Sequence, residues 1–283
     1  MQRERGMTLI ELVITMVVGS IVVAFMTMFI ITPINAYTAQ TRRAALVDAA
    51  DSALRFMARD VRTALPNSVR VYSSGSVSVL ELLATADGAR YADGGPLATA
   101  GQALDFTAKT GAFATVVPFT QLNLPWSSNS SYLAIYNVGV PGANAYQMSN
   151  VITPPNTTIT ISAGSSANQN LVTLSPVFKF AFDSPHGRVY LVSGPVSYLC
   201  DTSAGTLTRY SDYSIAYAQP TSAAALLGAG ATAALVAANV GACQFTYATG
   251  TAQRNGLATL LLKITQAGEW VQLLQEVQLV NAP

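Results

Sequence analysis

The longest apolar stretch of the chain lies near the N-terminus and is preceded by a glutamate. Residues 12–31 contain no charged side chain, and Glu11 stands immediately before them. At about 1.5 Å per residue, a helix of this length spans roughly 30 Å, the thickness of the hydrocarbon core of a bilayer. A carboxylate costs on the order of 2.5–3.5 kcal/mol at the centre of a membrane helix and less near its end. We therefore predict a transmembrane helix and expect Glu11 to have a positively charged partner.

A second pattern follows the apolar stretch and predicts that the helix continues beyond the membrane. Apolar residues recur every three or four positions, the spacing of one helix face, at Leu46, Ala50, Leu54, Met57, Val61 and Leu65. The opposite face carries charges, and Asp51 and Arg55 are spaced as an i,i+4 ion pair. We expect Pro33 to bend or break this helix and Pro66 to end it, because proline has no amide hydrogen to donate.

After residue 66 the pattern changes to short runs with strand-like alternation, separated by turn residues. The clearest is a predicted hairpin, in which strands at 257–265 and 270–280 are joined by residues 266–269. Further strands are predicted at 76–83, 103–107, 114–119, 132–138, 157–162, 171–174, 188–193 and 206–210. The fold class we predict is α+β, with a long N-terminal helix, first transmembrane and then amphipathic, packed on an antiparallel sheet. The predicted domains are residues 7–66 for the helix and 67–283 for the β-rich domain.

One segment inside the β-rich region is ambiguous. Residues 222–240 are rich in alanine and almost uncharged, which permits a second membrane span. Two glycines, Gly228 and Gly230, and the lack of flanking basic residues favour a helix or a flexible segment that leads into Cys243. No internal repeat accompanies it.

Composition and cysteine usage are consistent with an exported domain. Of the 283 residues, 51% are hydrophobic and 10% charged, and the net charge is +1, so no electrostatic argument favours nucleic acid as a partner. Cys200 and Cys243 are the only cysteines. Behind a membrane segment that routes the domain outward, we predict a disulfide between them, with two buried free thiols as the alternative.

Candidate catalytic groups are sparse, and we predict that the protein is not an enzyme and needs no cofactor or metal. The single histidine, His186, lies in a predicted turn and cannot complete a zinc site or a nucleophile relay with two distant cysteines. Two aspartate pairs, Asp87 with Asp93 and Asp201 with Asp212, would suit a cation or acid–base chemistry but fit turn positions better. The tyrosines between residues 190 and 217 favour strand packing over a stacking surface for a sugar or a protein partner.

The start of the chain resembles the signal of type IV pilins and their pseudopilin relatives. Residues 6–12 read GMTLIEL and follow a short basic leader, residues 1–6, that contains Arg3 and Arg5. The resemblance implies cleavage by a prepilin peptidase between Gly6 and Met7 and methylation of the new amino group. Glu11 then becomes the fifth mature residue and pairs with the amine of a neighbouring subunit. Met7 departs from the phenylalanine that is usual in the family.

The location implied by this reading is the bacterial inner membrane. The basic leader stays in the cytoplasm under the positive-inside rule, and the β-rich domain is periplasmic before it moves to a pilus or the cell surface. The apolar run is too long for a cleaved secretory signal, and no small-residue cleavage site follows it.

Other segments resemble the O-type minor pilins of the mannose-sensitive haemagglutinin (MSHA) pilus system. They are residues 42–55, 58–62, 65–70, 243–247, 254–257 and 275–283. This resemblance implies a minor subunit at the tip or in the initiation complex of a pilus. Its partners would be prepilin peptidase, other pilin subunits and the inner-membrane assembly platform. Two alternatives are a J-type minor pseudopilin of type II secretion and a membrane-anchored binding domain that does not polymerise.

Overall fold

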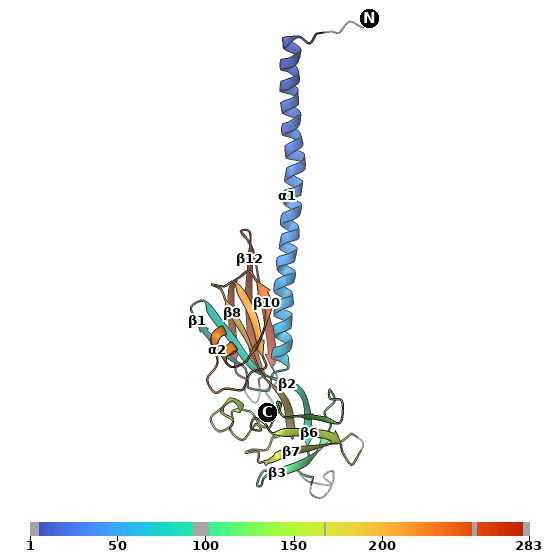
Figure 1. Ribbon diagram of the computed structural model, residues 1–283, viewed down its shortest axis with the longest axis vertical. Coiled ribbons are helices and arrows are strands. Elements are labelled where there is room, and N and C mark those ends of the chain that lie inside the picture. The colour runs from blue at the N-terminus through green and yellow to red at the C-terminus, as the bar shows by residue number, and fades with distance from the viewer. Residues whose placement is uncertain (1–5, 93–101, 167, 251–253, 280–283) are drawn as a thin grey trace. The chain divides into compact units, whose positions relative to one another are not determined.

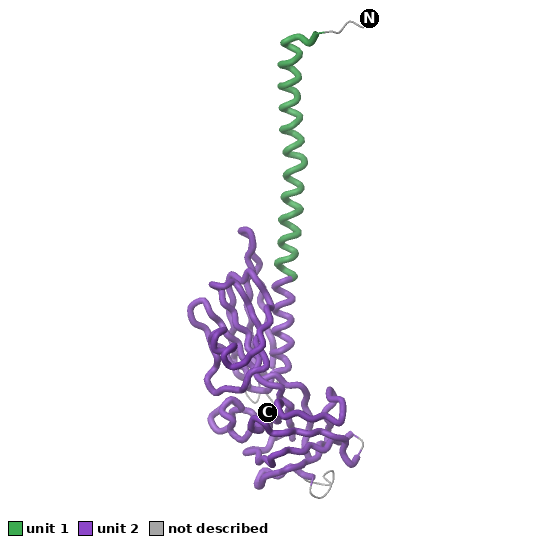
Figure 2. Tube along the Cα trace, in the orientation of Figure 1, with its two compact units in different colours: residues 1–48 green, residues 49–283 purple. Residues whose placement is uncertain are grey.

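The computed structural model describes residues 6–92, 102–166, 168–250 and 254–279 and shows an α+β fold (Figure 1). A single long helix, α1 (Leu9–Arg62), is followed by antiparallel strands. The chain divides into two compact units, residues 1–48 and 49–283, so that the division falls inside α1 (Figure 2). The predicted fold class is therefore correct. The leader arginines, Asp93 and residues 280–283 lie outside the described residues.

In the second unit, the last turns of α1 present the predicted apolar stripe to the protein core. Ala50, Leu54, Met57 and Val61 are each at most 2% exposed. The opposite side carries the predicted Asp51–Arg55 ion pair, with 2.7 Å between Oδ2 and Nε. This part of the sequence pattern is confirmed, because an amphipathic helix buries one face only.

The ends and the continuity of α1 differ from the prediction. The helix runs through Pro33 without a break, and it ends at Arg62 rather than at Pro66. Beyond Arg62 the backbone bonds to a strand instead of continuing the helix: Leu65 donates to the carbonyl of Leu83, and Thr85 donates to the carbonyl of Thr63. These long-range bonds end the helix one turn before the proline.

A ten-stranded antiparallel sheet forms most of the second unit. Its order is β10-β9-β8-β2-β3-β7-β6-β4, with β1 paired to β2 and β5 paired to β8. Two long strands, β2 (Val77–Tyr91) and β8 (Arg188–Asp201), pair along their length at the centre. The other strands are β1 (Arg70–Ser74), β3 (Thr110–Val117), β4 (Trp126–Ser128), β5 (Tyr132–Ala134), β6 (Thr158–Ala163), β7 (Asn170–Phe178), β9 (Thr206–Ser211) and β10 (Thr232–Ala238).

A separate three-stranded sheet contains the predicted hairpin. Its order is β11-β12-β13, with bounds β11 (Val240–Ala248), β12 (Gly256–Gln266) and β13 (Glu269–Leu279). The hairpin register runs without a shift from Gly256 opposite Leu279 to Gln266 opposite Glu269. Even-numbered residues of β12 from Gly256 to Ile264 are buried and the odd-numbered ones between them are half-buried, which is the alternation that predicted the strand.

A disulfide links the two sheets. Cys200 lies in β8 and Cys243 in β11, and their Cα atoms are 6.6 Å apart. Cys200 is fully buried. The bond therefore fixes the small sheet to the central strand of the large one.

One predicted strand is wrong in type, and one predicted helix is present only in part. Residues 103–107 form no strand, because the Asp105 carboxylate accepts hydrogen bonds from the amide and hydroxyl of Thr107 and closes a turn. The segment 222–240 begins as the predicted helix, α2 (Ala223–Gly228), but then turns at Gly230, with φ of 86°, and continues as strand β10. Ser222 caps α2 by accepting a bond from the amide of Ala225.

A 3₁₀ turn, η1 (Ala145–Gln147), completes the elements. The sequence patterns did not predict this turn or strands β1, β4, β10 and β11. Strands β4 and β10 pair with residues distant in the chain, which local propensity does not encode, whereas β1 and β11 form hairpins with the strands that follow them.

Candidate functional site

The start of α1 is built as a capped helix N-terminus. Thr8 precedes the helix, its carbonyl accepts the first helical bond from Leu12 at 3.1 Å, and its hydroxyl oxygen accepts a bond from the Glu11 amide at 3.4 Å. A threonine followed three residues later by a glutamate is the capping-box pattern, and a carboxylate in the first turn also favours the helix dipole. Local physics thus gives Glu11 a role in starting the helix in addition to the predicted role in assembly.

Gly6 has no structural need to be glycine. A Cβ built on it meets no atom within 4 Å, and its φ lies outside the left-handed region. Met7 is 62% exposed. The structure therefore leaves the predicted cleavage position accessible and gives no packing reason for the glycine.

The apolar part of α1 is exposed to solvent along its whole length. Every residue from 6 to 38 is exposed, including large side chains such as Leu9 at 83% and Phe29 at 75%. Among the described residues, this helix alone is long and apolar enough to cross a membrane by length and composition. An apolar surface of this size marks a membrane or an interface with another protein.

Polar side chains within the apolar stretch satisfy their own hydrogen bonds. The hydroxyls of Thr15, Ser20 and Thr27 donate to the carbonyls of residues three or four positions earlier, at 2.7–2.9 Å. Such bonds remove the cost of an unpaired hydroxyl in hydrocarbon. The segment is therefore compatible with lipid despite its polar residues.

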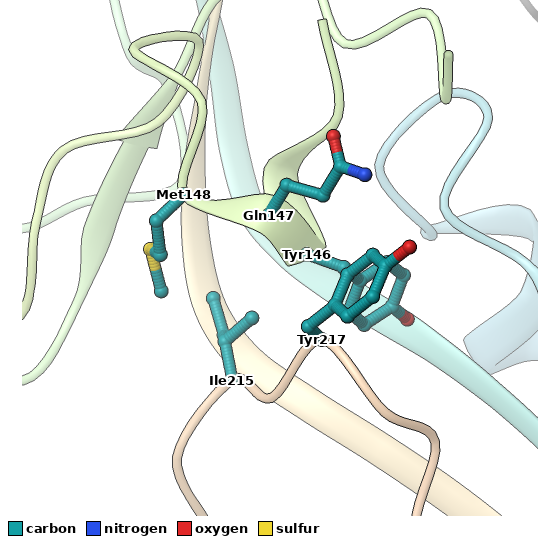
Figure 3. A pocket seen from close by; sticks show the side chains of 5 residues that line it. All are labelled: Tyr146, Gln147, Met148, Ile215 and Tyr217. Carbon is teal, nitrogen blue, oxygen red and sulfur yellow. The ribbon is translucent and has the colours of Figure 1, made fainter. Parts of the chain in front are cut away.

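A second candidate site is a shallow pocket of about 410 Å³ beside the β-sheet. Figure 3 shows its lining side chains, which come from η1 and from the loop after β9: Tyr146, Gln147, Met148, Ile215 and Tyr217. Two aromatic rings, two aliphatic side chains and one amide line it, without a charged side chain. This lining suits neutral groups and contains no nucleophile–base pair.

Arg70 fixes both sides of this pocket. Its guanidinium lies 3.6 Å from the centre of the Tyr146 ring, and it donates to the carbonyls of Tyr217 at 2.6 Å and Ala216 at 2.9 Å. Its Nε is also 2.7 Å from Oε2 of Glu81. The pocket is therefore held in shape before any ligand arrives.

The Glu81 carboxylate is fully buried in β2 and accepts a second hydrogen bond, from the Tyr213 hydroxyl at 3.0 Å. Burial raises the pKa of Glu81, and the neighbouring Arg70 opposes that rise. Burial likewise raises the pKa of the Tyr213 hydroxyl, which also hydrogen-bonds the hydroxyl of Ser197. This cluster stays inside the protein, and we assign it a structural role in positioning the 215–217 loop.

The residues considered for catalysis do not gather. The described part of the chain holds no group of three or more His, Cys, Asp or Glu side chains suited to a metal. His186 lies in a turn, and its carbonyl accepts a bond from Arg90. The Asp87 carboxylate accepts from the amides of Gly88 and Gln121, whereas Asp201 closes the β8–β9 turn and Asp212 bonds Ser211.

Sequence reasoning missed a polar cluster that attaches the last turn of α1 to the sheet. Asp60 Oδ2 accepts hydrogen bonds from the Tyr198 hydroxyl in β8 at 2.7 Å and from Arg209 Nε in β9 at 2.8 Å. Asp60 did not belong to the charged helix face that the sequence pattern predicted. Its position beside the buried stripe, one residue before Val61, was the available signal.

The features described above define a chain with an exposed, membrane-compatible N-terminal helix and a disulfide-linked β domain. Residues 1–27 match the family model described as the prokaryotic N-terminal methylation motif. The match includes Gly6, Met7 and Glu11, and it supports a type IV pilin-like protein whose leader is processed by prepilin peptidase. Neither the curated proteins nor the solved structures yielded a match to this chain.

Proposed function

We propose that this protein is a non-enzymatic minor pilin, processed between Gly6 and Met7 and assembled through α1 into the tip or initiation complex of an MSHA-type pilus. One observation carries the proposal: a methylation motif stands at the start of α1, and all residues from 6 to 38 are exposed. An exposed apolar helix of this kind needs lipid around it in the membrane and neighbouring subunits around it after assembly. Lateral packing of such helices against one another provides the contacts in the assembled state.

The glutamate supports assembly over simple anchoring. Cleavage at Gly6 creates an amine on Met7, four positions before Glu11. A carboxylate near the edge of hydrocarbon is costly when alone and much less so beside an ammonium group of a neighbouring subunit. The partners in this reading are prepilin peptidase, other pilin subunits and an inner-membrane assembly platform, with the β domain on the periplasmic side.

Mass spectrometry of the mature N-terminus tests the processing step. The expected product begins with N-methyl-Met7, whereas an intact Met1 in cells that process their other prepilins would refute it. Gly6→Val is the matched variant, because a side chain at this position meets no neighbouring atom. It should fold and insert normally while it retains residues 1–6.

The choice of a pilus over type II secretion depends on the segments that resemble O-type minor pilins. The methylation motif is compatible with both machines. Co-purification from cells that express both systems would separate the readings, since a pilus subunit should be recovered with pilins. Recovery with the secretion pseudopilins alone would favour the J-type alternative.

A further inference from the structure

The outer edge of β13 is a long row of backbone groups that no described strand pairs with. β13 extends over eleven residues and pairs with β12, and no other strand among the described residues pairs with it. In an antiparallel sheet, alternate residues of an edge strand direct their amide and carbonyl groups away from the sheet. The row is roughly 37 Å long at about 3.4 Å per residue.

The two end strands of the large sheet carry features that protect a sheet edge, whereas β13 carries none of them. β10, at one edge of the large sheet, has a register shift between Leu235 and Ala237, and β4, at the other, has three residues. Bulges, short strands, proline and lysine are the common devices that prevent strand addition. β13 contains neither proline nor lysine, and its register with β12 has no shift.

The outward face of β13 offers apolar contacts next to the open edge. Trp270 is 60% exposed and Leu274 is 58% exposed, and they lie on the same face, four residues apart. The Lys263 ammonium of β12 lies 4.5 Å from the centre of the Trp270 ring. A strand laid along the edge would bury part of both exposed side chains, because cross-strand neighbours on one face are in contact.

The charge of β13 indicates which kind of strand could pair with its open edge. β13 carries Glu269 and Glu276 and has no basic residue. Pairing with a second copy would bring the Glu276 carboxylate of each copy, and no basic side chain of either strand, to the exposed face of the new seam. A segment that alternates apolar and basic residues would place opposite charges across the seam, which stabilises a strand pair.

We propose that β13 is a docking edge that accepts, by strand addition, an extended apolar–basic segment of another protein chain. The backbone ladder would supply affinity, and Leu274 and Glu276 would select the apolar and basic side chains. This inference does not depend on processing at Gly6 or on assembly through α1, so either proposal can fail without the other.

The test uses the full-length protein in detergent micelles and a fluorescent eleven-residue peptide that alternates valine and lysine. Fluorescence anisotropy should show saturable binding. Hydrogen exchange followed by mass spectrometry should show slower exchange in residues 269–279 and unchanged exchange in residues 232–238. Glu276→Lys and Leu274→Lys should each weaken binding several-fold, whereas Leu235→Lys on β10, an equally exposed leucine, should not.

Control peptides distinguish strand addition from attraction between charges. A peptide of the same charge with two internal valines replaced by proline lacks ladder donors and should not bind. Equal binding of this peptide, or of a valine–glutamate peptide, would overturn the proposal. So would an absence of protection in residues 269–279, or self-association of the chain that Leu274→Lys abolishes, since a second copy would then occupy the edge.

Discussion

The hydroxyl of Tyr198 donates a 2.7 Å hydrogen bond to the carboxylate of Asp60 and so joins the centre of the large sheet to the last turn of α1. Arg209 holds the same oxygen at 2.8 Å and lies 5.9 Å from the centre of the Phe56 ring. Burial and the nearby Asp60 charge raise the pKa of Tyr198, so its hydroxyl stays protonated and keeps its role as a donor. Because hydrogen bonds are directional and apolar packing is not, this contact fixes the position of the last turn of α1 on the large sheet.

Asp60→Ala should therefore destabilise the β domain by about 2–3 kcal/mol, because it leaves Arg209 and the Tyr198 hydroxyl without their acceptor. Tyr198→Phe removes one of the two bonds and should cost about 1–2 kcal/mol. Urea unfolding followed by circular dichroism in detergent measures both changes. Asp51→Ala is the matched control, since its exposed pair with Arg55 contributes about 0.5 kcal/mol or less. Equal effects of the Asp60 and Asp51 variants would contradict the role we assign to Asp60.

Asp201 should make the stability of the β8–β9 turn depend on pH. Its carboxylate accepts bonds from the hydroxyl and amide of Ser203 and from the amide of Ala204, and the Ser203 hydroxyl lowers the pKa of Asp201 below its usual value. The folded state then holds this proton less tightly than the unfolded chain, whose aspartates titrate near about 3.9. The contribution is present above that pH and is lost as pH falls through the lower folded pKa.

Asp201→Ala should lower the thermal unfolding midpoint slightly at pH 7, and the difference from the parent should shrink by pH 3. The comparison between the two proteins cancels Glu81, whose raised pKa acts in the opposite sense. A difference that stays constant between pH 7 and pH 3 would show that the Asp201 charge does not act through the turn.

The disulfide should contribute substantially to the stability of the β domain. Cys200 and Cys243 are 43 positions apart, and the chain-entropy relation gives about 4 kcal/mol for a loop of that length. The double variant Cys200→Ala/Cys243→Ala should lose about 2–4 kcal/mol of unfolding free energy, measured in urea. Mass mapping without reductant should find the two cysteines joined in the parent. Two alkylatable thiols in exported protein would refute the pairing in the cell.

Segments with a periodic sequence pattern predicted their structure well, because the same face of the helix or strand that carries the apolar residues packs against the core. The stripe from Ala50 to Val61 and the alternation in β12 both appear in the structure as buried faces. The second half of the segment 222–240 was misread because alanine favours helix, whereas this half forms a strand that is fixed by pairing with β9, distant in the chain. The prediction that Pro66 ends the helix was wrong, because the helix ends at Arg62 and the residues after it bond to β2, which no local signal contains.

The same distinction between local and long-range signals applies to the residues of the candidate sites. Gly6, Met7 and Glu11 lie close together in the sequence, so a local motif could reveal them. The pocket joins Tyr146 to Tyr217 through Arg70, and these three residues meet only after the sheets have formed. A lone glutamate in an apolar strand, Glu81, was the one sequence signal for that cluster, because a buried carboxylate requires a partner.

Glu11 provides the most direct test of assembly. Glu11→Val removes the carboxylate and its favourable interaction with the helix dipole but keeps the backbone bond to the Thr8 hydroxyl, so it should cost α1 about 1 kcal/mol or less, too little to unfold a membrane helix. If Glu11 pairs with the Met7 amine of a neighbouring subunit, the variant should be cleaved and inserted normally but be depleted at least tenfold from purified filaments or initiation complexes. Quantitative immunoblotting of membranes and filaments measures both fractions. Asp51→Val, an exposed carboxylate later in the same helix, should be incorporated as the parent is. Normal incorporation of Glu11→Val would refute the pairing, and a failure of cleavage would place the role of Glu11 in recognition by the peptidase instead.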